Sequence, residues 1–263
     1  MHTPAEIAKN YVEIGAAKTR LPTGRLLLLS VLAGIFIALA GVGSQTVAVS
    51  IPMASLGKFL GACIFPAGLA MVLLAGSELF TGNTLIVISV LEKRASWGGL
   101  LRNWILVYLG NLVGGILVAA CVTYGHTLSL FDNGLAAAVV SGAAGKVNLS
   151  FTEGLLRGIL CNLLVCLGVW ISFAAKDVAG KILGLFFPVM LFVLCGYEHC
   201  VANMYFIPAG IFASAEYGIA AEGLTWGAFF VNNLIPVTLG NILGGAGIVG
   251  CGYWAIYLRN RER

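Results

Sequence analysis

The chain has 263 residues, of which 59% are hydrophobic and only 10% are charged, and its mean hydropathy is +0.97. So few charges exclude a soluble domain and predict one compact, polytopic, all-α membrane protein. The basic residues form no stripe, so the formal net charge of +4 does not indicate a nucleic-acid-binding protein. The 7 cysteines lie in or beside apolar runs without a CxxC pair. We expect them to be packing residues rather than ligands of a metal or a cofactor.

The segment 1–25 precedes the first long apolar run and lacks the compact apolar centre of a signal peptide. Thr3 and Glu6 have the spacing of a capping box, with Pro4 at the first helical position. Apolar residues recur on one face of the helix that would begin there. We therefore predict an amphipathic helix that lies on the membrane surface.

Six apolar stretches follow, and a membrane crossing needs roughly 20 such residues. The second and the fifth stretch are too long for one straight crossing. Glycine and polar residues interrupt both near the middle, so we expect two broken helices. Together the stretches form one membrane domain, residues 26–258. The expected spans are residues 26–49, 56–91, 100–122, 154–175, 182–216 and 226–258.

The distribution of basic residues sets the expected orientation. An even number of crossings puts both ends of the chain on one side, and most lysines and arginines fall in segments on that side. Only Lys58, Lys146 and Arg157 fall on the other side. By the positive-inside rule, the N-terminal segment and the C-terminal tail 259–263 are both expected in the cytoplasm, with the domain in the plasma (inner) membrane.

The two halves of the domain resemble each other in sequence. "GSELFTGN" (76–83) matches "GYEHCVAN" (196–203), and "NWILVYLGNLVGG" (103–115) matches "NLIPVTLGNILGG" (233–245). Each half would contain three spans, so the halves must be inverted relative to each other. Inverted repeats with breaks at matching places predict a transport site near the middle of the membrane. The halves cover residues 26–122 and 154–258.

Ionisable groups inside these breaks are costly in a bilayer and are therefore candidates for function. His199 lies beside Glu198 in the second break, and we expect it to face the transport path. Glu78 and Glu198 occupy equivalent positions, and so do Asn83 and Asn203. We expect these four to be structural, with the carboxylates accepting hydrogen bonds from free backbone N–H groups at the breaks. A proton relay through the carboxylates is the less favoured alternative.

Five segments together make the chain resemble the formate/nitrite transporter family: "AGSELFTGN", "GKVNLSF", "CNLLVCLGVW", "GYEHCVANMYFIPAG" and "NLIPVTLGNILGG". They occur in the family's order, and the resemblance extends from Arg25 to Leu258. The resemblance implies an aquaporin-like fold and a homopentamer with one pore in each subunit. It also implies passage of small monovalent anions such as formate, nitrite or hydrosulfide.

The resemblance also assigns site residues by position. The family's central histidine falls on His199, and its lysine falls on Lys146. Three further polar positions fall on Thr81, Asn162 and Asn233. For Asn162, a pore-lining role and an interhelical hydrogen bond are equally consistent with its place in an apolar span. Apolar side chains that narrow the pore are expected at Phe65, Leu69, Leu79, Phe80 and Phe192.

These residues suggest a hypothesis for transport. The anion of a weak acid enters the field of Lys146 and Asn162. His199, held by Thr81 and Asn233, hydrogen-bonds to the anion and protonates it transiently, and the neutral acid then passes the constriction. In the alternative, His199 stays neutral and only orients the ion. Besides the anion, protons and the lipid bilayer are the expected partners.

Formate is the favoured ion, with hydrosulfide and nitrite as alternatives within the family. "AGSELFTG" is similar to nitrite members, "NLIPVT" to formate members and "GYEHCVANMY" to hydrosulfide members. An aquaporin-like channel for neutral solutes is less favoured, because the paired Asn-Pro-Ala signatures are missing from the sequence. No HExxH motif, CxxC pair or second clustered histidine supports an enzyme, so we expect a channel or transporter without catalytic activity.

Overall fold

The computed structural model describes residues 1–259, and this part of the chain contains helices and no strand. Of the expected C-terminal tail 259–263, only Arg259 lies within the described residues, and the rest lies outside them. The first helix, α1 (Pro4–Thr19), begins with the expected capping box. The Thr3 hydroxyl accepts from the backbone N–H of Glu6 (3.3 Å), and the Glu6 carboxylate accepts from the backbone N–H of Thr3 (2.7 Å).

The first half of the membrane domain contains two continuous helices around a broken one. α2 (Thr23–Ala48) and α7 (Trp97–Tyr124) are the continuous helices. The helix between them is interrupted between Gly76 and Phe80, as the sequence predicted. Its parts are α3 (Ala54–Ile64), α4 (Pro66–Met71), the π-helical turn η1 (Val72–Gly76), α5 (Phe80–Asn83), the 3₁₀ turn η2 (Thr84–Ile86) and α6 (Val87–Leu91).

The second half follows the same order. α9 (Phe151–Ala174) is continuous, and the next span is broken between α10 (Val178–Leu194) and α11 (Cys200–Glu216). The last span is one rod of 32 residues from Trp226 to Tyr257. Its consecutive parts are α12 (Trp226–Ala228), the π-helical turn η4 (Phe229–Leu234), α13 (Ile235–Ile242), the π-helical turn η5 (Leu243–Cys251) and α14 (Gly252–Tyr257).

One helix was not expected. α8 (Gly134–Val147) follows the 3₁₀ turn η3 (Thr127–Ser129), in a segment that lies outside the six expected spans. It packs against α11, and its last turn carries Lys146. With 14 residues, α8 is too short to cross a bilayer. Apolar length alone therefore did not identify it.

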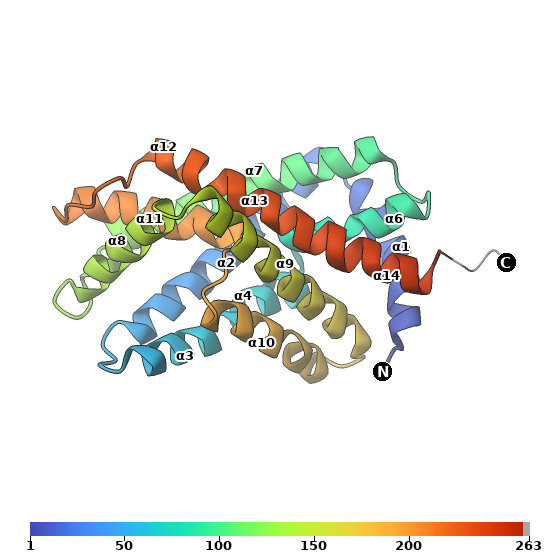
Figure 1. The fold of residues 1–263 in the computed structure, drawn as a ribbon, viewed down its shortest axis with the longest axis horizontal. Helices are drawn as coiled ribbons and strands as arrows, with labels where there is room; N and C mark the ends of the chain where they lie inside the picture. The colour runs from blue at the N-terminus through green and yellow to red at the C-terminus, as the bar shows by residue number, and fades with distance from the viewer. Residues whose placement is uncertain (260–263) are drawn as a thin grey trace.

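The two short helices α1 and α8 lie at opposite ends of the molecule (Figure 1). α1 packs against α6 and α14 at one end, and the long helices run between the ends, with α2 packed on α7 and α13 on α9. Ile7 and Tyr11 of α1 are buried in these contacts. The apolar face of α1 is therefore used for packing within the protein, and a position of this helix at the membrane surface stays a prediction.

Glycines allow the long helices to approach closely. A Cβ atom on Gly114 of α7 would clash with the backbone carbonyl oxygen of Val31 in α2. In the same way, a Cβ atom on Gly244 of η5 would clash with the backbone carbonyl oxygen of Ile159 in α9. Both glycines belong to GxxxG patterns, which favour close helix packing in membranes. The two patterns hold matching helix pairs together in the two halves.

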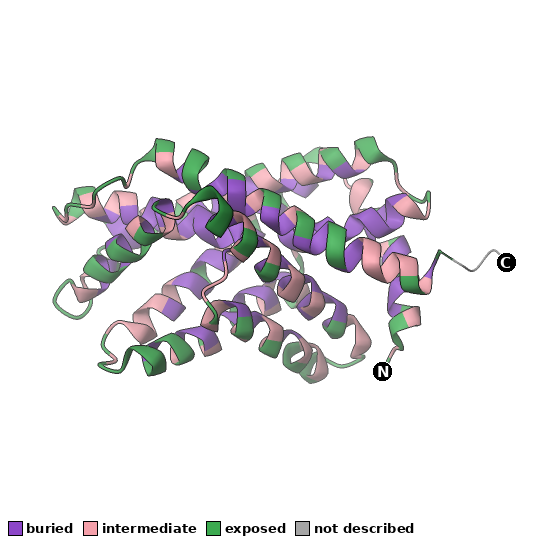
Figure 2. Ribbon diagram, viewed as in Figure 1, coloured by how far each residue is buried: buried purple, intermediate pink, exposed green. Residues whose placement is uncertain are grey.

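The outer surface of the molecule is apolar. Figure 2 shows exposed residues along the outward faces of the helices and buried residues toward the centre. Among the described residues, five helices are long and apolar enough to cross a membrane. Exposed apolar surface on this scale indicates contact with lipid or with other subunits, as in a multi-pass membrane protein. On α7 it is formed by every fourth residue, namely Trp97, Leu101, Ile105, Leu109, Val113 and Leu117.

Candidate functional site at the two helix breaks

The first part of each broken helix ends near a glycine in the left-handed region. Gly76 has φ of +85° and Gly196 has φ of +71°, a conformation that favours glycine because it has no Cβ. The backbone is then extended at Leu79 and His199, which directly precede α5 and α11. The breaks therefore leave backbone N–H groups at helix starts in the centre of the molecule, where each needs a partner.

Two fully buried asparagines provide such partners. The side-chain oxygen of Asn111 in α7 accepts from the backbone N–H of Phe80 at 2.9 Å, and its Nδ2 donates to two backbone carbonyls at 2.7 and 3.0 Å. Asn241 in α13 accepts from the backbone N–H of Cys200 at 2.9 Å and donates to two carbonyls at 2.8 and 3.0 Å. The sequence had shown the matching "LGN" segments but not this bracing role.

The carboxylate of the first break is paired with a lysine of α1. Glu78 Oε1 accepts from Lys18 Nζ at 2.7 Å, and its Oε2 accepts from Asn83 Nδ2 at 2.7 Å. Asn83 also donates to Asn103 Oδ1 (2.9 Å), and Asn103 donates to the carbonyl of Lys18 (3.2 Å). The repeated segments do not predict this pair, because α1 lies outside them.

The second break contains the same arrangement. Glu198 Oε1 accepts from Lys146 Nζ at 2.8 Å, and its Oε2 accepts from Asn203 Nδ2 at 2.7 Å. Asn203 also donates to Asn233 Oδ1 (2.7 Å), and Asn233 donates to the carbonyl of Lys146 (3.0 Å). The expectation that the break carboxylates accept from free backbone N–H groups is therefore wrong. A buried carboxylate needs a cation, and a lysine from a short helix supplies it in each half.

His199 caps the helix that follows it. Its Nδ1 accepts a hydrogen bond from the backbone N–H of Ala202 at 3.0 Å, so this nitrogen carries no proton. The proton of the neutral imidazole is then on Nε2, which lies 3.0 Å from the hydroxyl oxygen of Thr81 and donates to it. The hypothesis that Asn233 also holds His199 is wrong, because the Asn233 amide is bonded to α8, Asn203 and the second glutamate instead.

Thr81 stands at the centre of a buried polar cluster between α5, α9 and the last span. Its backbone carbonyl accepts from Asn162 Nδ2 (3.2 Å), from the Thr84 hydroxyl (2.6 Å) and from the Cys166 thiol (3.4 Å). Asn162 also donates to a backbone carbonyl of α13 at 2.7 Å. Of its two expected roles, Asn162 thus has the interhelical one in this structure, and it lines neither of the two cavities at the site.

The first of these cavities approaches the centre from the α1 end of the molecule. This α1-side cavity has a volume of about 680 Å³ and is lined by Lys18, Arg25 and Glu78. Its lining reaches Leu69 and Leu79. Two cations and one carboxylate therefore line the same space, and its inner end is apolar.

The second cavity approaches from the α8 end. This α8-side cavity has a volume of about 250 Å³. Its inner end is formed by Phe65, Phe192 and His199. Two cations and one carboxylate are again part of the lining, namely Lys58, Lys146 and Glu198.

Four apolar side chains separate the two cavities. Phe65 and Phe192 line the α8 side, Leu69 and Leu79 line the α1 side, and each of the four is only 3% exposed. The rings of Phe65 and Phe192 meet edge to face with their centroids 5.7 Å apart. The Phe192 ring also stacks on the imidazole of His199, with a centroid distance of 5.8 Å. His199 is therefore the polar group at this apolar partition.

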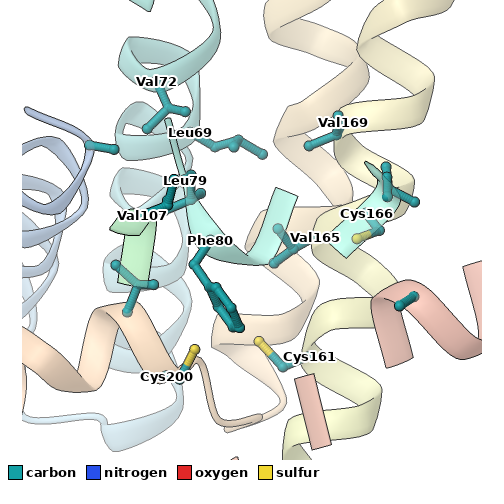
Figure 3. Packing of buried hydrophobic residues seen from close by; sticks show 14 of the residues in the cluster. Leu69, Val72, Leu79, Phe80, Val107, Cys161, Val165, Cys166, Val169 and Cys200 are labelled. Atoms are coloured by element: carbon teal, nitrogen blue, oxygen red, sulfur yellow. The ribbon is translucent and has the colours of Figure 1, made fainter. Parts of the chain in front are cut away.

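Phe80 does not take part in the partition. Its ring packs against Tyr108 and Trp104 of α7, with centroid distances of 4.9 and 6.0 Å, and it lines neither cavity. Figure 3 shows the ring pointing away from Leu69 and toward the thiol of Cys161. The expectation that Phe80 narrows the pore is therefore wrong, because Leu79 faces the α1-side cavity whereas Phe80, the first residue of α5, packs against α7.

Comparisons with known proteins agree with this arrangement. A family model described as "Formate/nitrite transporter" matches residues 5–255. The chain is 42% identical to the "Probable formate transporter" of Methanothermobacter thermautotrophicus, over 98% of this chain and 97% of that one.

Two solved structures have the same fold. One is titled "Pentameric formate channel with formate bound" (36% identity, TM-score 0.80, 90% of this chain and 98% of that chain). The other is titled "FNT family ion channel" (30% identity, TM-score 0.87, 95% of this chain and 98% of that chain). With its broken helices, paired cavities and central histidine, this chain belongs to the formate/nitrite transporter family of membrane anion channels.

Proposed function

We propose that the protein passes small monovalent anions of weak acids, formate first among them, between its two cavities. The observation that carries the proposal is the apolar partition with a single imidazole beside it, entered from both ends by lysine-lined cavities. The names of the relatives favour formate over nitrite and hydrosulfide, which are the alternatives.

The ion pairs make two buried carboxylates compatible with an anion path. Lys18 neutralises Glu78 and Lys146 neutralises Glu198, at 2.7 and 2.8 Å. One further cation lines each cavity, so both cavities keep an excess of positive charge. An excess of one sign in a low-dielectric cavity raises the local concentration of the opposite ion.

The partition is the barrier to the ion. Removing a small anion from water costs several kcal/mol even after the protein relaxes, and the side chains of Phe65, Leu69, Leu79 and Phe192 offer no hydrogen bond in return. His199 Nε2–H, which bonds to the Thr81 hydroxyl in this structure, is a donor at this point. We propose that the ring first takes up a second proton from the cavity water, on Nδ1, and becomes an imidazolium. Its Nε2–H then turns to the anion and transfers that proton to it, which leaves the ring neutral while the neutral acid crosses the partition.

The assembly and its orientation are part of the proposal. The formate-bound neighbour is a pentamer by its title, and we propose a homopentamer with one pathway in each subunit. The excess of basic residues at the α1 end supports cytoplasmic termini in the plasma (inner) membrane, so the α1-side cavity would open to the cytoplasm. The matching networks around Glu78 and Glu198 support an inverted repeat of three spans in each half.

The test is anion flux into proteoliposomes containing the purified protein, from about pH 5 to about pH 8, where a histidine titrates. Formate, nitrite, hydrosulfide, acetate and chloride are compared. His199→Asn is the sharpest variant, because an asparagine still caps the helix start but does not transfer a proton. His199→Phe removes both functions.

We expect formate flux that rises on acidification and that loses this pH dependence in His199→Asn. Unchanged flux and pH dependence in His199→Asn would reject proton transfer and leave His199 as an orienting group. Flux of hydrosulfide or nitrite alone would change the assigned substrate. Fast water or glycerol flux without any anion flux would support an aquaporin-like channel and reject the proposed function.

A further inference from the structure

The two lysines of the α8-side cavity differ in what balances their charge. Lys146 forms an ion pair with Glu198, whose side chain is 5% exposed. Lys58 lines the same cavity but is exposed and forms no ion pair with any carboxylate of the described residues. The excess positive charge of this cavity is therefore located at Lys58, in the first turns of α3, and not at Lys146.

Helix packing brings Lys58 to the side of α3 that faces α2. Gly57 and Gly61 are the contact points, because Cβ atoms there would come within 3.0 Å of Ala48 O and 2.9 Å of Ser44 O in α2. Lys58 is three residues before Gly61, so both lie on one helix face. The close approach of the backbones leaves Lys58 beside the polar residues of α2 that line the same cavity.

Those polar residues offer hydrogen-bond donors. The side-chain oxygen of Gln45 accepts from the Tyr205 hydroxyl at 3.1 Å, which fixes the amide and leaves its two N–H groups toward other partners. Neither these N–H groups nor the Ser44 hydroxyl donates to any described residue, and both side chains line the cavity. With Lys58, the cavity mouth thus has an ammonium, an amide and a hydroxyl that can all donate to one ligand.

We propose that Lys58, Gln45 and Ser44 form an anion-binding site at the mouth of the α8-side cavity, which captures the small monovalent oxyanion before it reaches His199. Lys146 then acts as the fixed counter-ion of Glu198 rather than as the recruiting charge. This inference rests on the proposed function and names the place where its substrate first binds.

The first experiment measures initial rates of formate flux in proteoliposomes for Lys58→Gln, Lys58→Glu and the wild type. Arg157→Gln is the matched control, because Arg157 is a basic residue expected on the same side but is not part of the cavity lining. Each variant is measured at low ionic strength (about 0.01 M) and at high ionic strength (about 1 M), where charges act over roughly 30 Å and 3 Å respectively.

At low ionic strength we expect a loss of about threefold for Lys58→Gln and about tenfold for Lys58→Glu. We expect both losses to shrink at high ionic strength and Arg157→Gln to match the wild type. Equal rates for all four proteins at low ionic strength would overturn the proposal. If the wild type itself passed no formate, the proposed function would be rejected instead. The failure of this inference and the failure of the proposed function therefore give different results.

A second experiment avoids the question of folding. Lys58→Cys is assembled into proteoliposomes and then treated with a thiosulfonate that adds either an ammonium or a sulfonate group. The wild type is treated in parallel, because Cys121 and Cys195 are also exposed. We expect the ammonium adduct to restore formate flux and the sulfonate adduct to lower it further. The same rate after both treatments would overturn the proposal.

Discussion

The two helix breaks share one set of braces but differ in the residue that follows the glutamate. In the first break Leu79 follows Glu78, and in the second His199 follows Glu198. Leu79 gives its helix start no side-chain cap, whereas His199 Nδ1 accepts from the N–H of Ala202 at 3.0 Å. The scaffold of the two breaks is thus the same, and a single position gives one of them a polar group at the partition.

This comparison separates residues that hold the site from residues that do the chemistry. A lysine, a glutamate and two asparagines close each network, and an asparagine of the LGN motif braces each break. Because these groups are buried and bonded to each other, removing one of them from the first break should lower the stability of the protein as much as removing its counterpart from the second break. The loss of His199 should affect transport far more than stability.

The largest effect is expected from leaving a break carboxylate without its cation. Lys146→Met leaves Glu198 buried and unpaired, and Lys18→Met does the same to Glu78, so each should lower the free energy of unfolding by about 3–5 kcal/mol. Thermal unfolding of the purified variants in detergent measures this loss of stability. The double variant Lys146→Met with Glu198→Gln should lose less than the sum of its single variants. Strictly additive losses would contradict the pairing.

A smaller loss is expected from removing one LGN brace. Asn241→Leu leaves the N–H of Cys200 and two carbonyls without partners, which should cost about 2–4 kcal/mol, given about 1–3 kcal/mol for each unsatisfied group and partial relaxation. Asn111→Leu is the matched variant in the first half. Similar losses of thermal stability in both variants would support the shared scaffold. A large loss in only one would show that one break alone depends on its brace.

Helix packing provides the next test. Gly244→Ala places a methyl group against the backbone of α9, and overpacking of this kind typically costs about 1–3 kcal/mol. Gly114→Ala does the same between α7 and α2. Gly247→Ala is the control on the same rod, because a Cβ there meets nothing within 4 Å. The thermal stabilities of the three variants are compared. Equal stability of Gly244→Ala and Gly247→Ala would contradict the close contact between Gly244 and the backbone of α9.

The smallest effect concerns the start of α1, the helix that supplies Lys18. Hydrogen bonds from the backbone N–H and then the hydroxyl of Thr3 lower the pKa of Glu6 below its ordinary value. The charged cap therefore stabilises the helix start at pH values above the ordinary carboxyl range, and this stabilisation is lost as the pH falls through the lowered pKa. Hydrogen exchange of the first turn should speed up on acidification. In Glu6→Gln this pH dependence should disappear, and its persistence would contradict the assignment.

The sequence alone determined the membrane class, the course of the long helices and the position of both breaks. These properties depend on hydropathy and on glycines over short stretches of chain, and so can be recognised locally. The matching segments around residues 76–83 and 196–203 also identified His199 and both glutamates as residues of the breaks. The family assignment followed from the same local motifs.

Only the tertiary structure decided which side chains meet. The Lys18–Glu78 pair, the bracing by Asn111 and Asn241, and the turning of Phe80 into the core join residues that are distant in sequence or depend on how α5 is rotated. Helix α8 was overlooked because it is short, and Asn233 was assigned to His199 although the geometry gives it to Asn203 and α8. Such contacts depend on helix crossing and side-chain direction, which hydropathy and motif spacing do not specify.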